Sequence, residues 1–158
     1  MPPAQTSIRF GCLGNICRSP LAHGIFQHLV NHSNQQHLYH IDSCGTGSWH
    51  VGNPPDPRSI QTAALYNIDI TSQRARQLDT LTDIERFDHI IPMDKANHRD
   101  LVAVGVPESK LKLMRSFDPA LNKPLDVPDP YYGGDNGFEQ VYQMLIRACQ
   151  GLHDHCQI

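Results

Sequence analysis

The chain has 158 residues, of which 39% are hydrophobic and 18% are charged. Because a domain usually takes about 100–200 residues, this length predicts one domain over residues 1–158 and leaves no room for a second catalytic domain. No apolar run approaches the ~20 residues that span a bilayer, and the first residues lack the basic and apolar segments of a secretory signal. We therefore expect a cytoplasmic protein without a membrane partner.

The charge pattern narrows the classes of ligand. Thirteen Lys and Arg against 16 Asp and Glu give a net charge of −3, with the basic residues scattered along the chain. This excludes the electrostatic footprint of a nucleic-acid-binding protein, so an anionic ligand must be held by a local device such as a helix N-terminus. The five cysteines lack the paired spacing of a zinc ribbon, and we expect no metal and no cofactor.

Predicted strands alternate with predicted helices along the chain. Apolar spacing and turn residues predict strands over residues 7–13, 38–43, 87–92 and near 110–114. Helices are predicted to begin at Ser19, to run over residues 58–66 and from about 94 to 104, and to follow a capping box of Asn136 and Glu139 near the C-terminus. Ser19 suits the N-cap and Pro20 the first helical position. This alternation predicts an α/β fold with a parallel sheet, whose ligands bind beyond the carboxyl ends of the strands.

The stretch CLGNICRSP, residues 12–20, connects the first predicted strand to the first predicted helix. Gly14 and Asn15 readily adopt left-handed conformations, so the loop can curl until successive backbone N–H groups form an anion-binding nest. Arg18 adds a planar fork for two phosphate oxygens, and the helix N-terminus adds partial positive charge. The same field favours a thiolate at Cys12 near neutral pH.

Together with the segments Ser43-Cys44-Gly45-Thr46 and Asp129-Pro130-Tyr131-Tyr132-Gly133, this stretch closely resembles the low-molecular-weight protein tyrosine phosphatases, over essentially the whole chain. The resemblance implies a four-stranded parallel sheet flanked by helices on both faces, with the phosphate-binding loop between the first strand and the first helix. It implies a protein tyrosine phosphatase, or acid phosphatase, that acts on phosphotyrosine proteins and aryl phosphate monoesters. Inorganic phosphate or another oxyanion would occupy the site, and we expect a monomer.

The resemblance also assigns roles to single residues. Cys12 is the expected nucleophile that forms a cysteinyl phosphate, Arg18 the phosphate clamp and Asp129 the general acid and base. Ser19 is expected to donate a hydrogen bond to the Cys12 sulfur, a role compatible with capping the helix. The expected phosphate-binding residues are Leu13, Gly14, Asn15, Ile16, Cys17 and Arg18.

The residues alone leave the acid ambiguous. Pro-Asp-Pro occurs twice, at residues 55–57 and 128–130, and Asp126 lies nearby. The family pattern selects Asp129, because the family's acid directly precedes Pro-Tyr in a late loop. Asp56 is then a turn former.

The aryl ring of the substrate is expected to lie among Trp49, Tyr131 and Tyr132, which match positions that line a deep slot in the family. The alternative is that the two tyrosines only pack a loop. Ile16 favours the phosphotyrosine branch, since relatives that act on phosphoarginine have Thr at the matching position.

Support for the loop and redox protection are two further expectations. Where the family usually has a His that bonds the loop Asn, this chain has Ser72 and Gln73, either of which can offer a hydrogen bond to Asn15, with Ser43 as a second support. Cys17 is expected to form a disulfide with oxidised Cys12 and so to protect it, or else simply to fill the loop. Asp94 and Asn97 are expected to brace the active-site side of the sheet.

Two other functions remain as alternatives. Thioredoxin-coupled arsenate reductases resemble this scaffold, but they relay oxidation through two further cysteines, and this chain has none within residues 77–88. A non-catalytic phosphoprotein-binding module would keep Arg18 but needs neither Cys12 nor Asp129, and both are present. A nucleotide-binding Walker loop is excluded because its Lys-Ser/Thr ending is absent.

Overall fold

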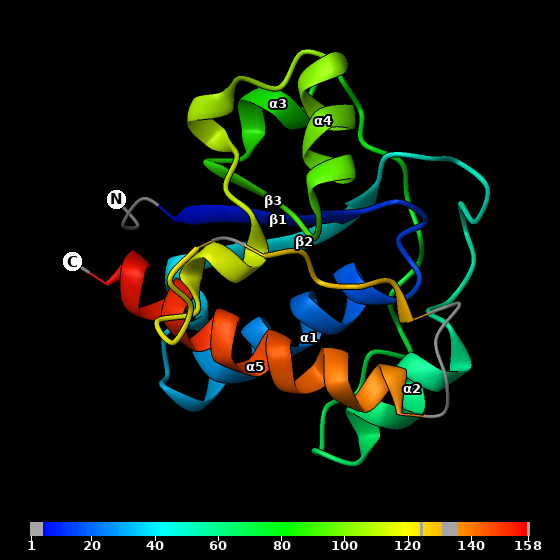
Figure 1. Cartoon of the computed structure of the whole chain (residues 1–158), viewed down its shortest axis with the longest axis vertical. Helices are drawn as coiled ribbons and strands as arrows, with labels where there is room; N and C mark the ends of the chain where they lie inside the picture. The colour runs from blue at the N-terminus through cyan, green and yellow to red at the C-terminus, as the bar shows by residue number, and fades with distance from the viewer. Residues whose placement is uncertain (1–4, 124, 131–135, 158) are drawn as a thin grey trace.

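The chain folds into a parallel sheet with helices on both faces (Figure 1), as predicted from the sequence. The computed structural model describes residues 5–123, 125–130 and 136–157. In chain order its elements are β1 (Thr6–Cys12), α1 (Arg18–His32), η1 (Gln36–Leu38), β2 (Tyr39–Gly45), α2 (Pro57–Ala64), α3 (Asp83–Arg86), β3 (His89–Pro92), α4 (Lys95–Ala103), η2 (Glu108–Lys110), η3 (Met114–Phe117) and α5 (Gly137–Cys156).

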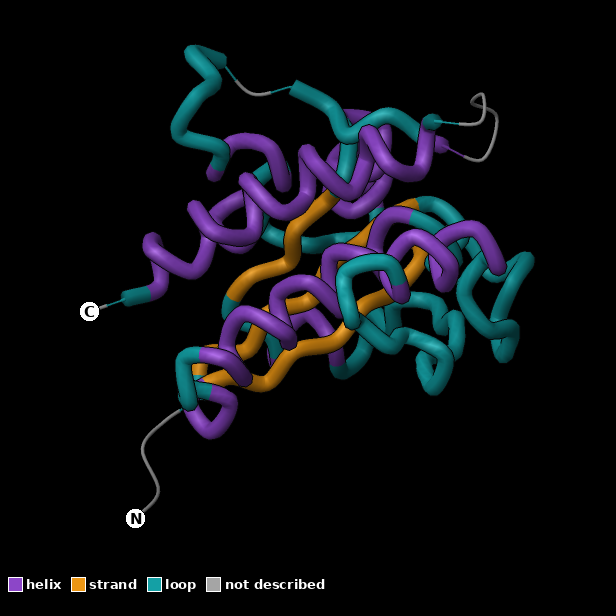
Figure 2. Tube along the Cα trace, turned by 90° about the horizontal axis from the view of Figure 1, so that it is seen from below, coloured by secondary structure: helices purple, strands orange, loops and turns teal. Residues whose placement is uncertain are grey.

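The sheet places β1 between its two neighbours, in the order β2-β1-β3, with all strands parallel. Helices α1, α2 and α5 cover one face, and α3 and α4 cover the other (Figures 1 and 2). At the carboxyl end of β1, Cys12 pairs with Gly45 of β2 and Gly11 pairs with Pro92 of β3. The loops after the three strands therefore meet at one edge of the sheet.

The period-two alternation of β1 separates two cores. Ile8, Phe10 and Cys12 belong to the apolar cluster that α1 and α5 cover. Between them Arg9 faces the other way, with its guanidinium carbon 4.7 Å from the centre of the Phe87 ring. Phe87 belongs to the second apolar cluster, together with Leu101 of α4. Helix α5 packs an apolar stripe against the core, since the following residues are all buried: Phe138, Val141, Tyr142, Leu145, Cys149 and Leu152.

The expected fourth strand near residues 110–114 is wrong. In the described part of the chain, the sheet has three strands, and Leu111 makes only one isolated bridge, to Ile90. The 3-10 turns η2 and η3 lie on either side of Leu111, so the extended segment between them is too short to form a ladder.

Two helix starts also differ from expectation. Helix α1 begins at Arg18 with Cys17 at its N-cap, so Ser19 lies inside the helix. Asn136 is the N-cap of α5, but its side chain makes no capping hydrogen bond. Glu139 accepts hydrogen bonds from Tyr66 Oη and from Gln143 instead, so a tertiary contact has replaced the capping box. None of the helices in the described ranges combines the length and apolar character needed to cross a bilayer.

Candidate active site

A cavity of about 410 Å³ opens where the loop after β1 meets the loop after β2 and the segment that contains Asp129. Most of the residues expected to bind phosphate or substrate line it, and they share the carboxyl edge of the sheet with the start of α1. The lining residues are Cys12, Leu13, Gly14, Ile16, Cys17, Arg18, Trp49, His50 and Asp129. The cavity therefore gathers a thiol, a guanidinium and a carboxyl group from segments more than 100 residues apart.

The side chain of Asn15 stabilises the loop after β1 through three hydrogen bonds. Asn15 has φ of 59°, the left-handed conformation predicted for it, and its side chain is 2% exposed. Its Oδ1 accepts from the Arg76 backbone N–H at 2.9 Å, and its Nδ2 donates to Ser19 Oγ at 2.8 Å and to Ser43 Oγ at 3.0 Å. Because a backbone N–H can only donate, this pattern fixes the orientation of the amide.

The amide orientation has a consequence for the Cys12 sulfur. Ser19 Oγ accepts from Asn15, which leaves its single hydrogen free for another partner. Cys12 Sγ lies 2.9 Å from Ser19 Oγ, and Cys12 as a whole residue is 3% exposed. The serine hydroxyl can therefore donate to the sulfur.

Arg18 is held in place by contacts from two other segments. Its Nη1 donates to Asp94 Oδ2 at 2.6 Å and to the Val127 carbonyl at 2.9 Å, while Nη2 lies 3.9 Å from Asp129 Oδ2. Burial alone would lower the pKa of Arg18, but the charge at Cys12, the hydrogen bond and charge of Asp94, and Asp129 outweigh it and raise the pKa. Arg18 is thus a permanent, oriented cation at the cavity wall.

The rim of the loop is fixed by backbone bonds to the segments that follow β2. Thr46 N–H donates to the Cys12 carbonyl and Gly47 N–H to the Leu13 carbonyl, both at 2.9 Å. The close approach needs glycine, because a Cβ on Gly45 would lie 2.9 Å from the Leu13 carbonyl oxygen. Glycine at the end of β2 therefore lets the two loops approach each other closely.

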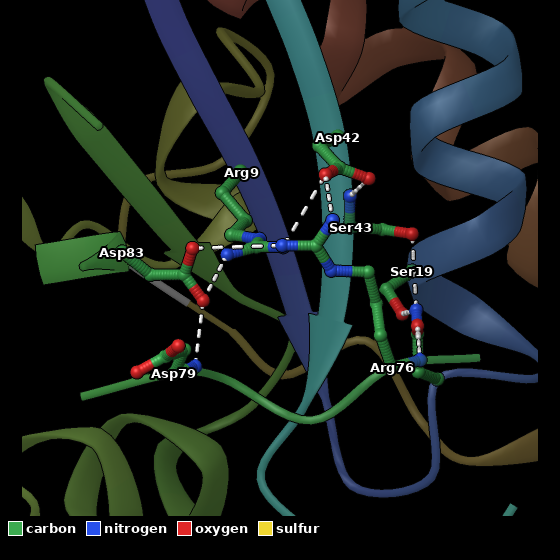
Figure 3. Close-up of polar contacts among 8 residues, drawn as sticks. Arg9, Ser19, Asp42, Ser43, Arg76, Asp79 and Asp83 are labelled. Carbon is green, nitrogen blue, oxygen red and sulfur yellow. Dashed lines mark hydrogen bonds and ion pairs between the residues drawn. The ribbon is translucent and has the colours of Figure 1, made fainter. Parts of the chain in front are cut away.

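An ion-pair cluster includes the side chain of Arg76, whose backbone supports the phosphate loop (Figure 3). Arg9, fully buried on β1, pairs with Asp83 and, at 3.3 Å, with Asp42. Arg76 bridges the same two carboxylates, at 3.0 Å from Asp42 and 3.5 Å from Asp83. Since the backbone of Arg76 also holds Asn15, the cluster anchors the segment that supports the phosphate loop.

The two Pro-Asp-Pro segments occupy different environments. Asp56 is the N-cap of α2, where its carboxylate accepts from Arg58 N–H at 2.8 Å and pairs with the Arg58 guanidinium at 3.0 Å. Burial would raise the pKa of Asp56, but the hydrogen bonds and charge of Arg58 outweigh it and lower the pKa. Asp129 instead lines the cavity beside Arg18. Asp126 accepts from Lys95 N–H at 3.0 Å.

Several expected contacts differ in the structure. Gln73 donates to the Pro20 carbonyl at 3.2 Å, and Ser72 is exposed on the surface, so the partner of Asn15 in this stretch is the Arg76 backbone instead. The tertiary path of the chain brings residue 76, not 72 or 73, over the loop. Gly14 is not left-handed: its φ is not among the positive values, and a Cβ there would lie 2.9 Å from the His50 ring.

The remaining expected residues are placed as follows. Trp49 lines the cavity and is 71% exposed. Cys17 lines it as well, and burial, followed by the charges of Asp56 and Cys12, raises its pKa to about 12. Tyr131 and Tyr132 lie outside the described residues. Asn97 donates its backbone N–H to Asp94, the N-cap of α4, at 2.7 Å.

Some participants in the site were not predicted, because they come from distant segments. His50 lines the cavity directly after Trp49. Asp94 does more than brace the sheet, because it contacts Arg18 itself. Arg76 has no local pattern that marks it, although its backbone N–H bonds the Asn15 side chain. Within the described residues, no group of three or more His, Cys, Asp or Glu side chains is arranged to hold a metal ion.

Comparisons with known proteins agree with this geometry. The family model described as low molecular weight phosphotyrosine protein phosphatase matches residues 7–157. A protein of that name from Sus scrofa is 43% identical over 150 residues, covering 92% of each chain. The crystal structure of a protein tyrosine phosphatase from Entamoeba histolytica, with Hepes in its active site, superposes with a TM-score of 0.88 at 33% identity and covers 95% of this chain and 96% of that one. A Drosophila arginine phosphatase superposes with a TM-score of 0.86 at 30% identity, covering 96% and 98%. The chain therefore belongs to the low molecular weight phosphotyrosine protein phosphatase family.

Proposed function

We propose that this chain hydrolyses phosphotyrosine in proteins, and related aryl phosphate monoesters, through a cysteinyl-phosphate intermediate. The observation that carries the proposal is the placement of Cys12, Arg18 and Asp129 around one cavity at the start of α1. A thiol, an oriented cation and a carboxyl group are the three groups that this chemistry needs, as nucleophile, charge stabiliser and proton donor.

In the first step, Cys12 attacks phosphorus and the phenolic oxygen leaves. Phosphoryl transfer requires neutralisation of charge on the equatorial oxygens. Arg18 provides it, since Asp94 and Val127 already orient its guanidinium through Nη1. Asp129, in its protonated form, gives its proton to the departing phenolate.

In the second step, water hydrolyses the cysteinyl phosphate. The carboxylate of Asp129, now deprotonated, takes a proton from the attacking water. Ser19 eases the departure of the Cys12 sulfur by donating its hydroxyl hydrogen, an assignment supported by the 2.9 Å separation of the two atoms. The serine hydrogen is free for this because Asn15 donates to Ser19 Oγ.

The substrate ring would lie beside Trp49, whose exposed side chain forms one wall of the cavity. Tyr131 and Tyr132 are proposed to complete the slot on the family pattern. The likeness to an arginine phosphatase shows that this fold is shared by a protein named for another phosphorylated side chain. Ile16, which lines the cavity, supports the aryl substrate because an apolar wall favours a phenyl ring over a guanidinium.

A second part of the proposal concerns redox protection by Cys17 in a reducing, cytoplasmic setting. Peroxide oxidises the Cys12 thiolate to a sulfenic acid; the Cys17 sulfur then attacks, a disulfide forms, and the hydroxyl leaves as water with the Cys17 proton. The raised pKa of Cys17, about 12, keeps it a thiol at neutral pH, so Cys12 is oxidised first. After peroxide treatment, dithiothreitol should restore the activity of the native chain more fully than that of Cys17→Ser; equal recovery would remove this part.

Turnover of para-nitrophenyl phosphate and of a phosphotyrosine peptide tests the main proposal. Cys12→Ser should have no turnover, and Asp129→Ala should lose about 100-fold in kcat with poor leaving groups but less with activated ones. Asp56→Ala is the matched control from the other Pro-Asp-Pro segment, and it should retain kcat within a few-fold. A larger loss in Asp56→Ala than in Asp129→Ala would overturn the acid assignment. Binding of phosphate without any turnover would favour a silent phosphoprotein-binding module.

A further inference from the structure

A second, smaller cavity shares a wall with the active-site cavity. Its volume is about 190 Å³, and Leu13 and Trp49 line both cavities. From these two side chains it extends to Leu78 and Thr80 on one side and to Val104, at the end of α4, on the other. None of the proposed catalytic groups reaches it, so phosphoryl transfer gives no reason for its presence.

Leu13 and Trp49 form the wall that the two cavities share. Trp49 packs directly over Gly47: a Cβ at residue 47 would lie 1.8 Å from Trp49 Cζ3. Glycine at this position therefore lets the indole lie against the loop, where it lines both cavities. A ligand that fills the active-site cavity thus has the second cavity next to it, on the other side of the wall formed by Leu13 and Trp49.

The lining identifies the chemistry of the occupant. Large apolar side chains are exposed here to an unusual degree: Leu13 is 43% exposed, Trp49 71% and Val104 49%. Clustered apolar surface of this kind marks an interaction site. The charged residue of the lining is Asp100, a carboxylate that repels acidic side chains. A volume of about 190 Å³ is below the ~300 Å³ from which small-molecule sites usually begin, so it suits one side chain.

We propose that the second cavity is a specificity subsite that takes an apolar side chain of the phosphotyrosine substrate, two residues from the phosphotyrosine. In an extended peptide, side chains two residues apart point to the same side and are about 6.6 Å apart, so they can enter two adjoining cavities. The subsite adjoins the active-site cavity, with Leu13 and Trp49 as the shared wall. It rests on the proposed function and names the class of substrate: phosphotyrosine segments with a nearby apolar residue.

The test compares phosphotyrosine peptides that are otherwise polyalanine and carry Leu, Ala, Asp or Lys two residues before or after the phosphotyrosine. At one of these two positions, kcat/KM for Leu should exceed that for Ala by about tenfold, as expected for an apolar side chain in an apolar pocket. Asp should be poorer than Ala. In Val104→Asp the ratio of Leu to Ala should fall to about 1, and Thr80→Phe, which fills the cavity from its other side, should give the same loss.

Val102→Asp is the matched control. Val102 is 39% exposed in the last turn of α4, two residues before the C-cap Val104, and does not line the cavity, so the new charge has a similar unfavourable interaction with the helix dipole. It should keep the tenfold ratio and the native turnover of para-nitrophenyl phosphate.

Other outcomes would overturn the subsite. Equal kcat/KM for Leu and Ala at both positions, together with normal turnover of para-nitrophenyl phosphate, removes the subsite and leaves the proposed function intact. No turnover of either substrate by the folded chain removes the proposed function itself. A preference for Lys over Leu contradicts an apolar occupant. If the chain self-associates, Val104→Asp abolishes the self-association, and kcat/KM is equal for the Leu and Ala peptides, the cavity belongs to a contact with a second copy of the chain and the subsite is wrong.

Discussion

Asn15 is the residue whose replacement should most clearly separate loop geometry from loop hydrogen bonding. Its buried side chain makes three hydrogen bonds, at 2.8, 2.9 and 3.0 Å, and its φ is 59°. At about 1 kcal/mol net for each bond, their loss lowers the free energy of unfolding by about 3 kcal/mol. Asn15→Ala loses about 1 kcal/mol more, because a Cβ disfavours the left-handed region, whereas Asn15→Gly avoids this part.

Urea unfolding followed by circular dichroism measures both variants, with kcat/KM for an aryl phosphate as the second readout. The expected order of stability is native, then Asn15→Gly, then Asn15→Ala, with an unchanged dependence on urea concentration. Both variants should lose at least about tenfold in kcat/KM, since Ser19 and the loop lose their support. An Asn15→Ala protein within about 0.5 kcal/mol of the native one, or more stable than Asn15→Gly, would refute this reasoning.

Three further predictions concern stability. Gly151→Ala should lower the thermal midpoint although Ala favours helices, because its Cβ would lie 1.8 Å from the Phe117 carbonyl oxygen; a higher midpoint would contradict the packing of α5. Arg9→Leu should cost about 3 kcal/mol in urea unfolding by leaving Asp83 buried with less compensation, and Arg9→Leu/Asp83→Leu should cost less than the sum of the single changes. Additive losses would argue against coupling. Asp56→Ala should lose about 1 kcal/mol at pH 7 as an N-cap. Because the pKa of Asp56 is lowered on folding, this stabilisation is complete above the unfolded pKa, about 3.9, and should fade as pH falls through the folded value. A difference from native that persists in acid would refute the ionic contribution.

Strong periodicity made some of the fold predictable. The C-terminal helix α5 and the first strand β1 are confirmed, because a local apolar pattern specifies each. The segment around Leu111 has the apolar composition of a strand, but flanking 3-10 turns limit it to one bridge. The capping box failed because Tyr66, distant in sequence, bonds the carboxylate of Glu139.

The candidate site shows the same division between local and tertiary information. Cys12 and Arg18 belong to one contiguous loop, so their composition and spacing already indicate an anion site. The residues that hold this loop come from segments joined only by the fold: Asp94 contacts Arg18, and the Arg76 backbone bonds Asn15. No short pattern marks these contacts. The two Pro-Asp-Pro segments could not be distinguished by local chemistry, since only their tertiary positions separate a helix cap from a cavity wall.

Intact-protein mass spectrometry after rapid acid quench during turnover of an aryl phosphate tests the central claim most directly. The account predicts one added phosphoryl group per chain, located on Cys12 by peptide mapping and absent from Cys12→Ser. In Asp129→Ala, the amount of phosphorylated Cys12 reports the balance between formation and hydrolysis of the cysteinyl phosphate when the proton donor is missing. Steady turnover with no phosphorylated Cys12, or with the phosphoryl group on another side chain, would contradict the account.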